Sequence, residues 1–264
     1  MAQAFAATQA FAAETVEGAV EHAAIDPLYQ FEIARLVELN FLGLDISFTN
    51  SALFMLLGTA LVGIFMLLSM RGRALVPNRS QSITEMSYEF VAGMVRDNAG
   101  SEGLKYFPFI FTLFMFILFV NLLGLFPYSF TATSHIIVTL ALGVAAVTIV
   151  TIIGFVKHGT GFLKLFAPDG VPGWLYPILI PIEVISYLVR PFSLAVRLFA
   201  NMVAGHMVLK VFASFVVLMG VFGFIPFSLM IAINALELLI AFLQAYVFAL
   251  LTSIYLNDAL HPHH

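Results

Sequence analysis

Residues 174–218 read WLYPILIPIEVISYLVRPFSLAVRLFANMVAGHMVLKVFASFVVL, which is 45 residues without a cluster of turn-forming residues. As one helix this segment would be about 68 Å long, more than twice the roughly 30 Å of hydrocarbon in a bilayer. One upright helix is therefore excluded, and the segment holds either two short crossings or one long, steeply tilted helix. Pro177, Pro181 and Pro191 permit bending, and the hydrophilic linker that a hairpin would use is absent.

The composition of the whole chain is that of a membrane protein. Of its 264 residues, 61% are hydrophobic and 10% are charged, whereas a soluble domain carries about 25% charged residues. So few charges exclude a water-soluble globular protein. A net charge of -4 without a basic run argues against nucleic acid as a partner. The chain lacks cysteine and a phosphate-binding loop of the type GxxxxGK(S/T), so we expect no thiolate metal site, no nucleotide and no cofactor.

The other apolar segments predict an all-α, polytopic membrane protein. Phe48 to Met70 is a run of 23 uncharged residues, and about 20 helical residues suffice to cross the hydrocarbon. Residues 83–98 instead place apolar side chains on one helical stripe with charges elsewhere, which is typical of an amphipathic helix at the interface. The expected ranges are 48–70, 83–98 (interfacial), 107–128, 135–156, 174–218 and 226–256, in a single membrane domain over 46–264.

Most of the charges indicate the topology. Residues 1–45 hold seven acidic residues against Arg35, a net charge of -6, and form an acidic N-terminal tail. A cluster of arginines follows the first crossing, so by the positive-inside rule this end faces the cytoplasm and the tail lies on the outer, periplasmic side. The expected crossings leave the C-terminus in the cytoplasm. The basic residues expected there are Arg71, Arg73, Arg79, Arg96, Lys105, Lys157 and Lys164.

A second group of charges lies where lipid should exclude them, within residues 174–256. An ionised side chain at the bilayer centre costs about 2.5 to 3.5 kcal/mol on insertion scales, so such residues normally face protein or a water-filled cavity. Several of them in two helices indicate function. Glu183 and Lys210 fit a structural role at an interface equally well. The six residues are Glu183, Arg190, Arg197, His206, Lys210 and Glu237.

Periodicity and chemistry divide these residues by role. At 100° per residue, Arg197 and His206 lie about 180° apart on one helix, whereas Glu237 and Gln244 fall within about 20° of each other on the next. Arginine keeps its proton in a protein, so Arg197 can hold a fixed charge but cannot pass a proton. His206 and a partly desolvated Glu237 can both titrate near neutral pH and act as relay stations. This combination indicates directed proton movement; the alternative is a buried ion pair that only fixes packing.

Two stretches of the chain resemble a known family. Residues 190–206 (RPFSLAVRLFANMVAGH) and 237–248 (ELLIAFLQAYVF) closely resemble the signature of subunit a of the F-type ATP synthase membrane sector, in its mitochondrial and related bacterial form. The resemblance extends over about residues 46–258. It implies a pair of long, strongly tilted membrane helices that wrap around a rotating ring of small hairpin subunits, which favours tilt over a hidden hairpin in 174–218.

The function that the resemblance implies is that of a non-catalytic, proton-translocating stator subunit. Two offset half-channels lead to and from the carboxylates of the rotating c-ring and couple proton flow to ATP synthesis, while other subunits make the ATP. The implied partners are the c-ring, peripheral-stalk b-type subunits, the other ATP synthase subunits and the lipid bilayer. The acidic tail, without an Arg-rich transit pattern, favours the bacterial inner membrane over the mitochondrial one.

The resemblance also implies roles for single residues. Arg197 is expected to face the ring carboxylate and to stop protons from passing directly between the half-channels. Some family members carry an acid three residues after the position of Asn121, but this chain has Gly124 there, so no proton step is assigned to it. The polar residues near the arginine are Asn201 and Gln244, those of the outer half-channel are His206, Glu237 and Asn121, and those of the inner half-channel are Glu183, Ser186 and Ser193.

The alternatives are an ion-channel subunit, a secondary transporter and a structural scaffold. Voltage sensors repeat arginine at short helical intervals, whereas Arg190 and Arg197 are seven residues apart. A secondary transporter would show an internal repeat with paired broken helices, which we do not find. A scaffold leaves Arg197 unexplained. His261, His263 and His264 fit a solvated chain end better than a metal site, so we expect no bound metal.

Overall fold

The computed structural model describes residues 33, 35–37, 40–41, 44–45, 47–71, 78–126, 129–166 and 172–261. Within these residues the protein is an all-α membrane protein with a few very short strands, as the sequence predicts for its fold class. The predicted acidic tail lies almost wholly outside the described residues, and Arg73, His263 and His264 also lie outside them.

Among the described residues, four short strands precede the helix that starts at Asn50, and they were not predicted. β1 (Arg35–Val37) pairs antiparallel with β4 (Phe48–Thr49), and β2 (Asn40–Phe41) pairs with β3 (Leu44–Asp45). β4 takes the first two residues of the range expected to be helical. The helix starts instead at Asn50, a residue type favoured at helix N-termini.

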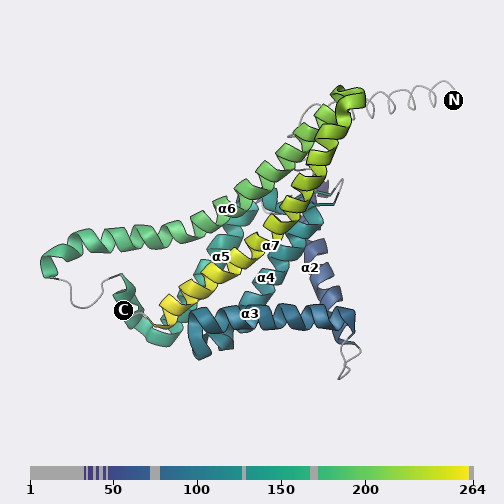
Figure 1. The fold of residues 1–264 in the computed structure, drawn as a ribbon. Coiled ribbons are helices and arrows are strands. Elements are labelled where there is room, and N and C mark those ends of the chain that lie inside the picture. The colour runs from purple at the N-terminus through teal and green to yellow at the C-terminus, as the bar shows by residue number, and fades with distance from the viewer. Residues whose placement is uncertain are drawn as a thin grey trace. The chain divides into compact units, whose positions relative to one another are not determined.

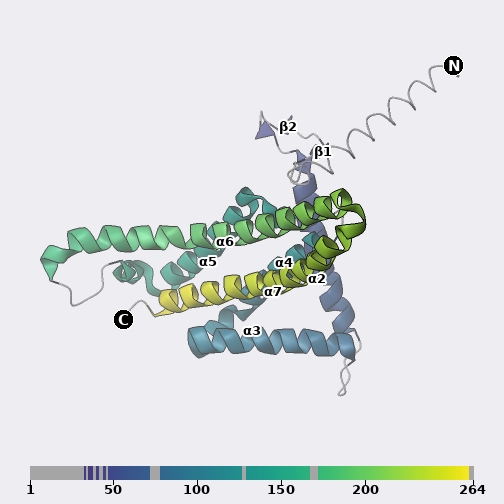
Figure 2. The same cartoon turned by 45° about the horizontal axis from the view of Figure 1, so that its top comes forward.

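One charged helix lies across two apolar helices. α2 (Asn50–Met70) and α4 (Phe107–Gly124) are apolar, whereas α3 (Arg79–Gly103) is charged and runs across them (Figures 1 and 2). α3 includes the range 83–98 that was expected to form an amphipathic helix and is longer than it. Its place at the membrane interface stays a prediction. A glycine with a φ of 65°, Gly100, bends α3 near its end. The 3-10 turn η2 (Leu104–Tyr106) leads into α4.

α4 ends at Gly124, four residues before the expected boundary at 128. The sequence explains the difference, because Pro127 disfavours helical backbone at the residue before it. The 3-10 turn η3 (Ala132–Ser134) then leads into α5 (Ile136–His158). After α5 come the short 3-10 segments η4 (Gly159–Leu165) and η5 (Gly173–Leu175).

The segment 174–218, which is too long for one upright membrane helix, forms a single helix, α6 (Tyr176–Leu218), of 43 residues. The helix continues through Pro181 and Pro191. Because it is unbroken, the alternative of two short crossings is wrong. The 3-10 turn η6 (Gly220–Gly223) reverses the chain into α7 (Phe224–Leu260). A Cβ at Gly223 would lie 2.5 Å from the carbonyl oxygen of Val216, which explains the need for glycine at this reversal.

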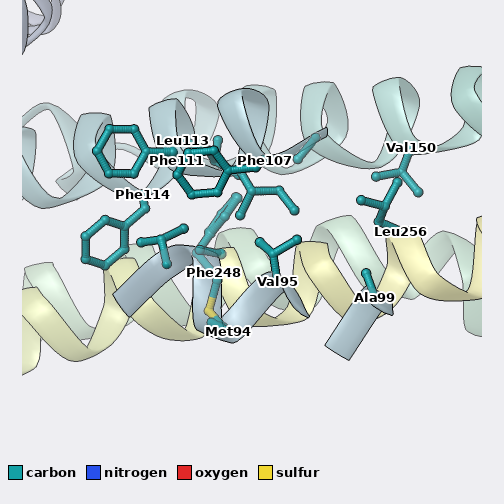
Figure 3. Close-up of a cluster of buried hydrophobic side chains, with 14 of the residues drawn as sticks. Met94, Val95, Ala99, Phe107, Phe111, Leu113, Phe114, Val150, Phe248 and Leu256 are labelled. Carbon is teal, nitrogen blue, oxygen red and sulfur yellow. The ribbon is translucent and has the colours of Figure 1, made fainter. Parts of the chain in front are cut away.

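The chain divides into two compact units. One comprises residues 51–202 and 238–264, and the other comprises residues 203–237 together with the described residues up to Asn50. The first unit has a core of buried apolar side chains from α3, α4, α5 and α7 (Figure 3). Core members with less than 3% exposure include Val95, Ile110, Phe114, Val150, Phe248 and Leu256.

Apolar side chains also cover much of the protein surface. Five helical segments among the described residues are long and apolar enough to cross a membrane. In the segment of α6 that meets this criterion only 11% of residues are buried, and side chains such as Phe192 and Val217 are exposed. A large exposed apolar surface is unfavourable in water and normal in lipid or against another protein. The chain is therefore a multi-pass membrane protein.

Candidate functional site

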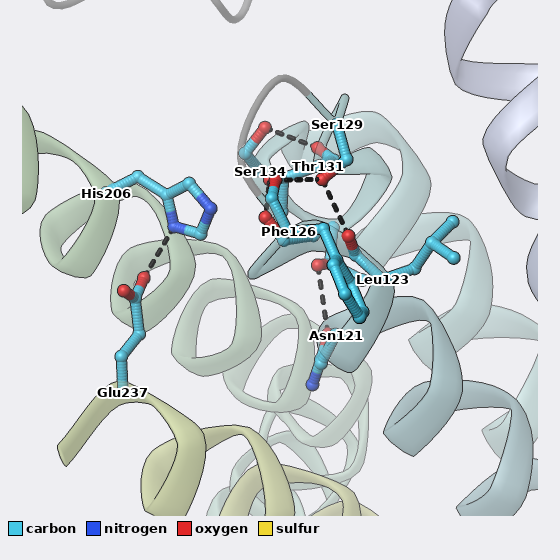
Figure 4. Close-up of polar contacts among 10 residues, drawn as sticks. Asn121, Leu123, Phe126, Ser129, Thr131, Ser134, His206 and Glu237 are labelled. Carbon is cyan, nitrogen blue, oxygen red and sulfur yellow. Dashed lines mark hydrogen bonds and ion pairs between the residues drawn. The ribbon is translucent and has the colours of Figure 1, made fainter. Parts of the chain in front are cut away.

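Glu237 is a buried carboxylate in contact with one histidine. The side chain of Glu237 in α7 is 2% exposed and that of His206 in α6 is 10% exposed. His206 Nδ1 and Glu237 Oε1 lie 2.6 Å apart, and the two side chains point toward each other (Figure 4). Among the described residues neither oxygen of Glu237 has a well-aligned hydrogen-bond donor. The imidazole is therefore the group that offsets the cost of burying this carboxylate.

Gly205 makes room for this contact. A Cβ at Gly205 would lie 2.6 Å from Glu237 Oε1 and 3.0 Å from its Cδ, and the three atoms nearest to that position all belong to Glu237. Any side chain there would force the carboxylate away from α6. The sequence therefore places a glycine directly beside the histidine so that the carboxylate can reach the imidazole.

The geometry of the pair suits proton transfer. A separation of 2.6 Å between a histidine nitrogen and a carboxylate oxygen is within the range for direct transfer. The sequence analysis placed His206 and Glu237 on helices that could bring them together, and the structure brings them into contact.

Asn121 lies in the other compact unit, fully buried in α4. Its Oδ1 accepts a hydrogen bond of 3.0 Å from Thr133 Oγ1 in η3 (Figure 4). His135, which precedes α5, stacks its ring on Phe130 at a centroid distance of 5.1 Å. Burial lowers the pKa of His135, so this histidine is neutral at pH 7. Gln244 of α7, also in this unit, is 6% exposed.

Arg197 is exposed on a face of α6 that carries small and polar residues. Ser186, Ser193 and Ala200 are exposed on α6, while Leu194 is buried against the core. Within the described part of the chain no ion pair or hydrogen bond joins Arg197 to another side chain. An exposed arginine on an apolar helix normally faces protein, a water-filled cavity or the polar edge of the membrane.

Arg190, the residue before Pro191 in α6, is compensated within the chain. Its Nη1 donates a 2.9 Å hydrogen bond to Asp258 Oδ2 of α7, and the two side chains are 23% and 30% exposed. The guanidinium lies over the rings of Tyr187 and Tyr255, with its Cζ 5.2 Å and 4.7 Å from the ring centroids. Tyr187 in turn makes a 2.6 Å hydrogen bond with Thr151 of α5.

Asp258 and the two tyrosines were missed by sequence reasoning. A signal was present, because Tyr187 precedes Arg190, and Tyr255 precedes Asp258, by three residues each, and that spacing puts each pair on one helical face. The end of α7 is also bound to α5, since Lys157 Nζ and His158 Nε2 contact the carbonyl oxygen of Leu260 at 3.3 Å and 2.9 Å.

The remaining predicted residues are not joined to one another. Glu183 and Asn201 are half-buried on α6, and Ser186 and Ser193 are exposed on it. Among the described residues no hydrogen bond or ion pair links these four side chains to each other or to Gln244. Their assignment to half-channels stays a prediction.

Comparison with known proteins identifies similar chains. The family model described as ATP synthase A chain matches residues 52–257. The chain is 58% identical to the ATP synthase subunit a of Chelativorans sp. over 248 residues, which are 91% of this chain and 100% of the relative. It is 57% identical to the proteins of the same name from Mesorhizobium japonicum and Xanthobacter autotrophicus, over 91% of this chain and 98% and 99% of those relatives.

The Arg190 cluster gives a stability prediction. Arg190→Ala removes an ion pair and two cation–π contacts, so we expect it to lower the free energy of unfolding by about 1 to 2 kcal/mol. The loss should be smaller in an Asp258→Asn background, because the pair is then already broken. Arg190→Lys, which keeps the charge but not the planar group, should fall in between. Thermal midpoints of the detergent-solubilised protein measure this; equal midpoints for Arg190→Ala and wild type would refute it.

Proposed function

The chain belongs to the ATP synthase A chain family, and from this membership we propose that it is the proton-translocating stator subunit of an F-type ATP synthase membrane sector. The observation that carries the proposal is the 2.6 Å contact between His206 and Glu237. A titratable pair buried in two apolar helices is costly unless it has a function, and proton transfer is what such a pair can do. The subunit itself is non-catalytic, and ATP is made by other subunits of the complex.

Arg197 acts as the barrier between two half-channels. Because its guanidinium cannot release a proton, it blocks proton passage while attracting a carboxylate. Its exposure, without a partner among the described residues, supports a partner on another subunit. We assign that partner to the carboxylate of a c-ring subunit. The exposed small residues around Arg197, such as Ala200, allow another helix to approach closely.

The half-channel residues carry protons to and from that carboxylate. On the outer side these are Asn121, His206, Glu237 and Gln244, with Asn201 near the arginine. A proton neutralises the ring carboxylate, which can then turn into lipid. On the inner side Ser193, Ser186 and Glu183 receive the proton when the carboxylate ionises again beside Arg197. One charge moved across 100 mV yields about 2.3 kcal/mol, so several protons are needed for each ATP.

The membrane setting follows from the same proposal. A 43-residue helix is about 65 Å long, so α6 must tilt strongly to stay within roughly 30 Å of hydrocarbon. We place the protein in a bacterial inner membrane with its N-terminus periplasmic and its C-terminus cytoplasmic, in line with the charge asymmetry of the sequence. Peripheral-stalk b-type subunits and the c-ring are its proposed partners in the complex.

The barrier role predicts the effect of removing Arg197. In membrane vesicles that contain the whole complex, Arg197→Ala should abolish ATP-driven proton pumping and leave the amount of assembled complex unchanged. Arg96→Ala, which removes an exposed arginine from α3, serves as the control and should pump normally. Quenching of a pH-sensitive dye reports pumping, and normal pumping by Arg197→Ala would rule out the barrier role.

The relay role predicts that the pair works in either order. His206→Ala and Glu237→Ala should each reduce pumping by at least about tenfold, since a positioned proton-transfer group contributes about 10²–10⁴-fold. The double exchange His206→Glu with Glu237→His restores one acid and one imidazole, so it should pump better than either single variant. If the exchange were no better than the single alanine variants, the two residues would not form one relay.

A further inference from the structure

A buried turn rich in hydroxyl groups connects α4 to α5. Thr131, Thr133 and Ser134 are only 2% to 3% exposed. Buried hydroxyls need hydrogen-bond partners, and two of these three bond to nearby backbone. Ser134 Oγ donates to the carbonyl oxygen of Thr131 at 2.6 Å, and Thr131 Oγ1 donates to that of Gly124 at 3.4 Å. Thr133 differs, because its partner is a side chain on α4.

The carbonyl of Ala241 and the hydroxyl of Thr133 bind the two ends of the Asn121 amide. Thr133 Oγ1 donates to Asn121 Oδ1 at 3.0 Å, and Asn121 Nδ2 lies 3.5 Å from the carbonyl oxygen of Ala241 in α7. A carbonyl oxygen can only accept, so the amide nitrogen must be the atom on the α7 side. The amide oxygen then faces Thr133, which must be the donor. The two contacts therefore agree on one of the two possible amide orientations.

The packing around the turn leaves this hydroxyl little freedom. A Cβ at Gly124 would lie 2.8 Å from Thr131 Cγ2, so the turn packs directly on the backbone of α4. Asn121 is fully buried, and Thr133 is nearly so. A side-chain hydrogen bond in such a site is costly to leave unmade. The turn thus holds Thr133 in place beside Asn121, which lies about one helical turn before Gly124 in α4.

We propose that Thr133 is a positioning residue of the outer half-channel, whose hydroxyl holds the Asn121 amide with its NH2 group toward α7. This inference rests on the proposed function. Asparagine does not titrate, so Asn121 can contribute to proton movement only by orienting a proton carrier such as water. An amide that flipped would turn its oxygen toward the Ala241 carbonyl, which can only accept, so that carbonyl selects the orientation. The hydrogen bond from Thr133 holds the Asn121 amide in that orientation.

A double-mutant cycle tests the proposal in membrane vesicles of the whole complex. Thr133→Val keeps the shape of the side chain but removes the hydroxyl, and we expect it to slow ATP-driven proton pumping about fivefold or more, as for one lost buried hydrogen bond. Thr133→Ser keeps the hydroxyl and should pump near the wild-type rate. In an Asn121→Leu background, Thr133→Val should add no further loss, because its partner is already absent.

The control is Thr112→Val, which removes an exposed hydroxyl that bonds only within α4, to the Pro108 carbonyl at 2.7 Å. It should pump normally. Equal loss for Thr133→Ser and Thr133→Val, or a full additional loss in the Asn121→Leu background, would overturn the proposal. If Thr133→Val and Thr133→Ala both failed to assemble while Thr133→Ser assembled, the role would be structural and the proposal wrong. Arg197→Ala in the same vesicles tests the proposed function separately, since normal pumping there contradicts it whatever Thr133 does.

Discussion

The constraint on which the structure depends is the cost of placing an ionisable group in an apolar helix. Each such group must find a partner, reach water or lose its charge. Glu237 meets this constraint through His206, 2.6 Å away, and Gly205 supplies the space that the carboxylate needs. On our proposal the same constraint makes the pair useful, because an acid and an imidazole in direct contact can pass a proton between them.

The two arginines of α6 show two ways of meeting the constraint. Arg190 is compensated inside the chain by Asp258 and by the faces of two tyrosines, which joins α6 to the C-terminal end of α7. Arg197 has no such compensation among the described residues and lies on an exposed face. An exposed arginine that the described residues do not compensate is suited to meet a carboxylate that arrives from elsewhere, and our proposal assigns it that role.

Much of the fold could be predicted from the sequence, because long apolar runs determine where membrane helices form, whatever their neighbours are. The pairing of His206 with Glu237 was within reach for a similar reason, since few ionisable residues lie in the apolar segments. Asp258 and Thr133 were not, because periodicity gives the face of a helix on which a residue lies but not the distant element that meets it. The short strands before α2 were also missed, since pairs of two or three residues carry no periodic signal.

The most direct test of the account is the rate of ATP-driven proton pumping by Gly205→Ala. The three atoms nearest to a Cβ at this position all belong to the Glu237 side chain, whereas a Cβ at Gly63 of α2 would meet nothing within 4 Å. We expect Gly205→Ala to assemble normally but to pump as poorly as Glu237→Ala, while Gly63→Ala pumps like wild type. Normal pumping by Gly205→Ala would contradict the claim that the contact between His206 and Glu237 carries the proton.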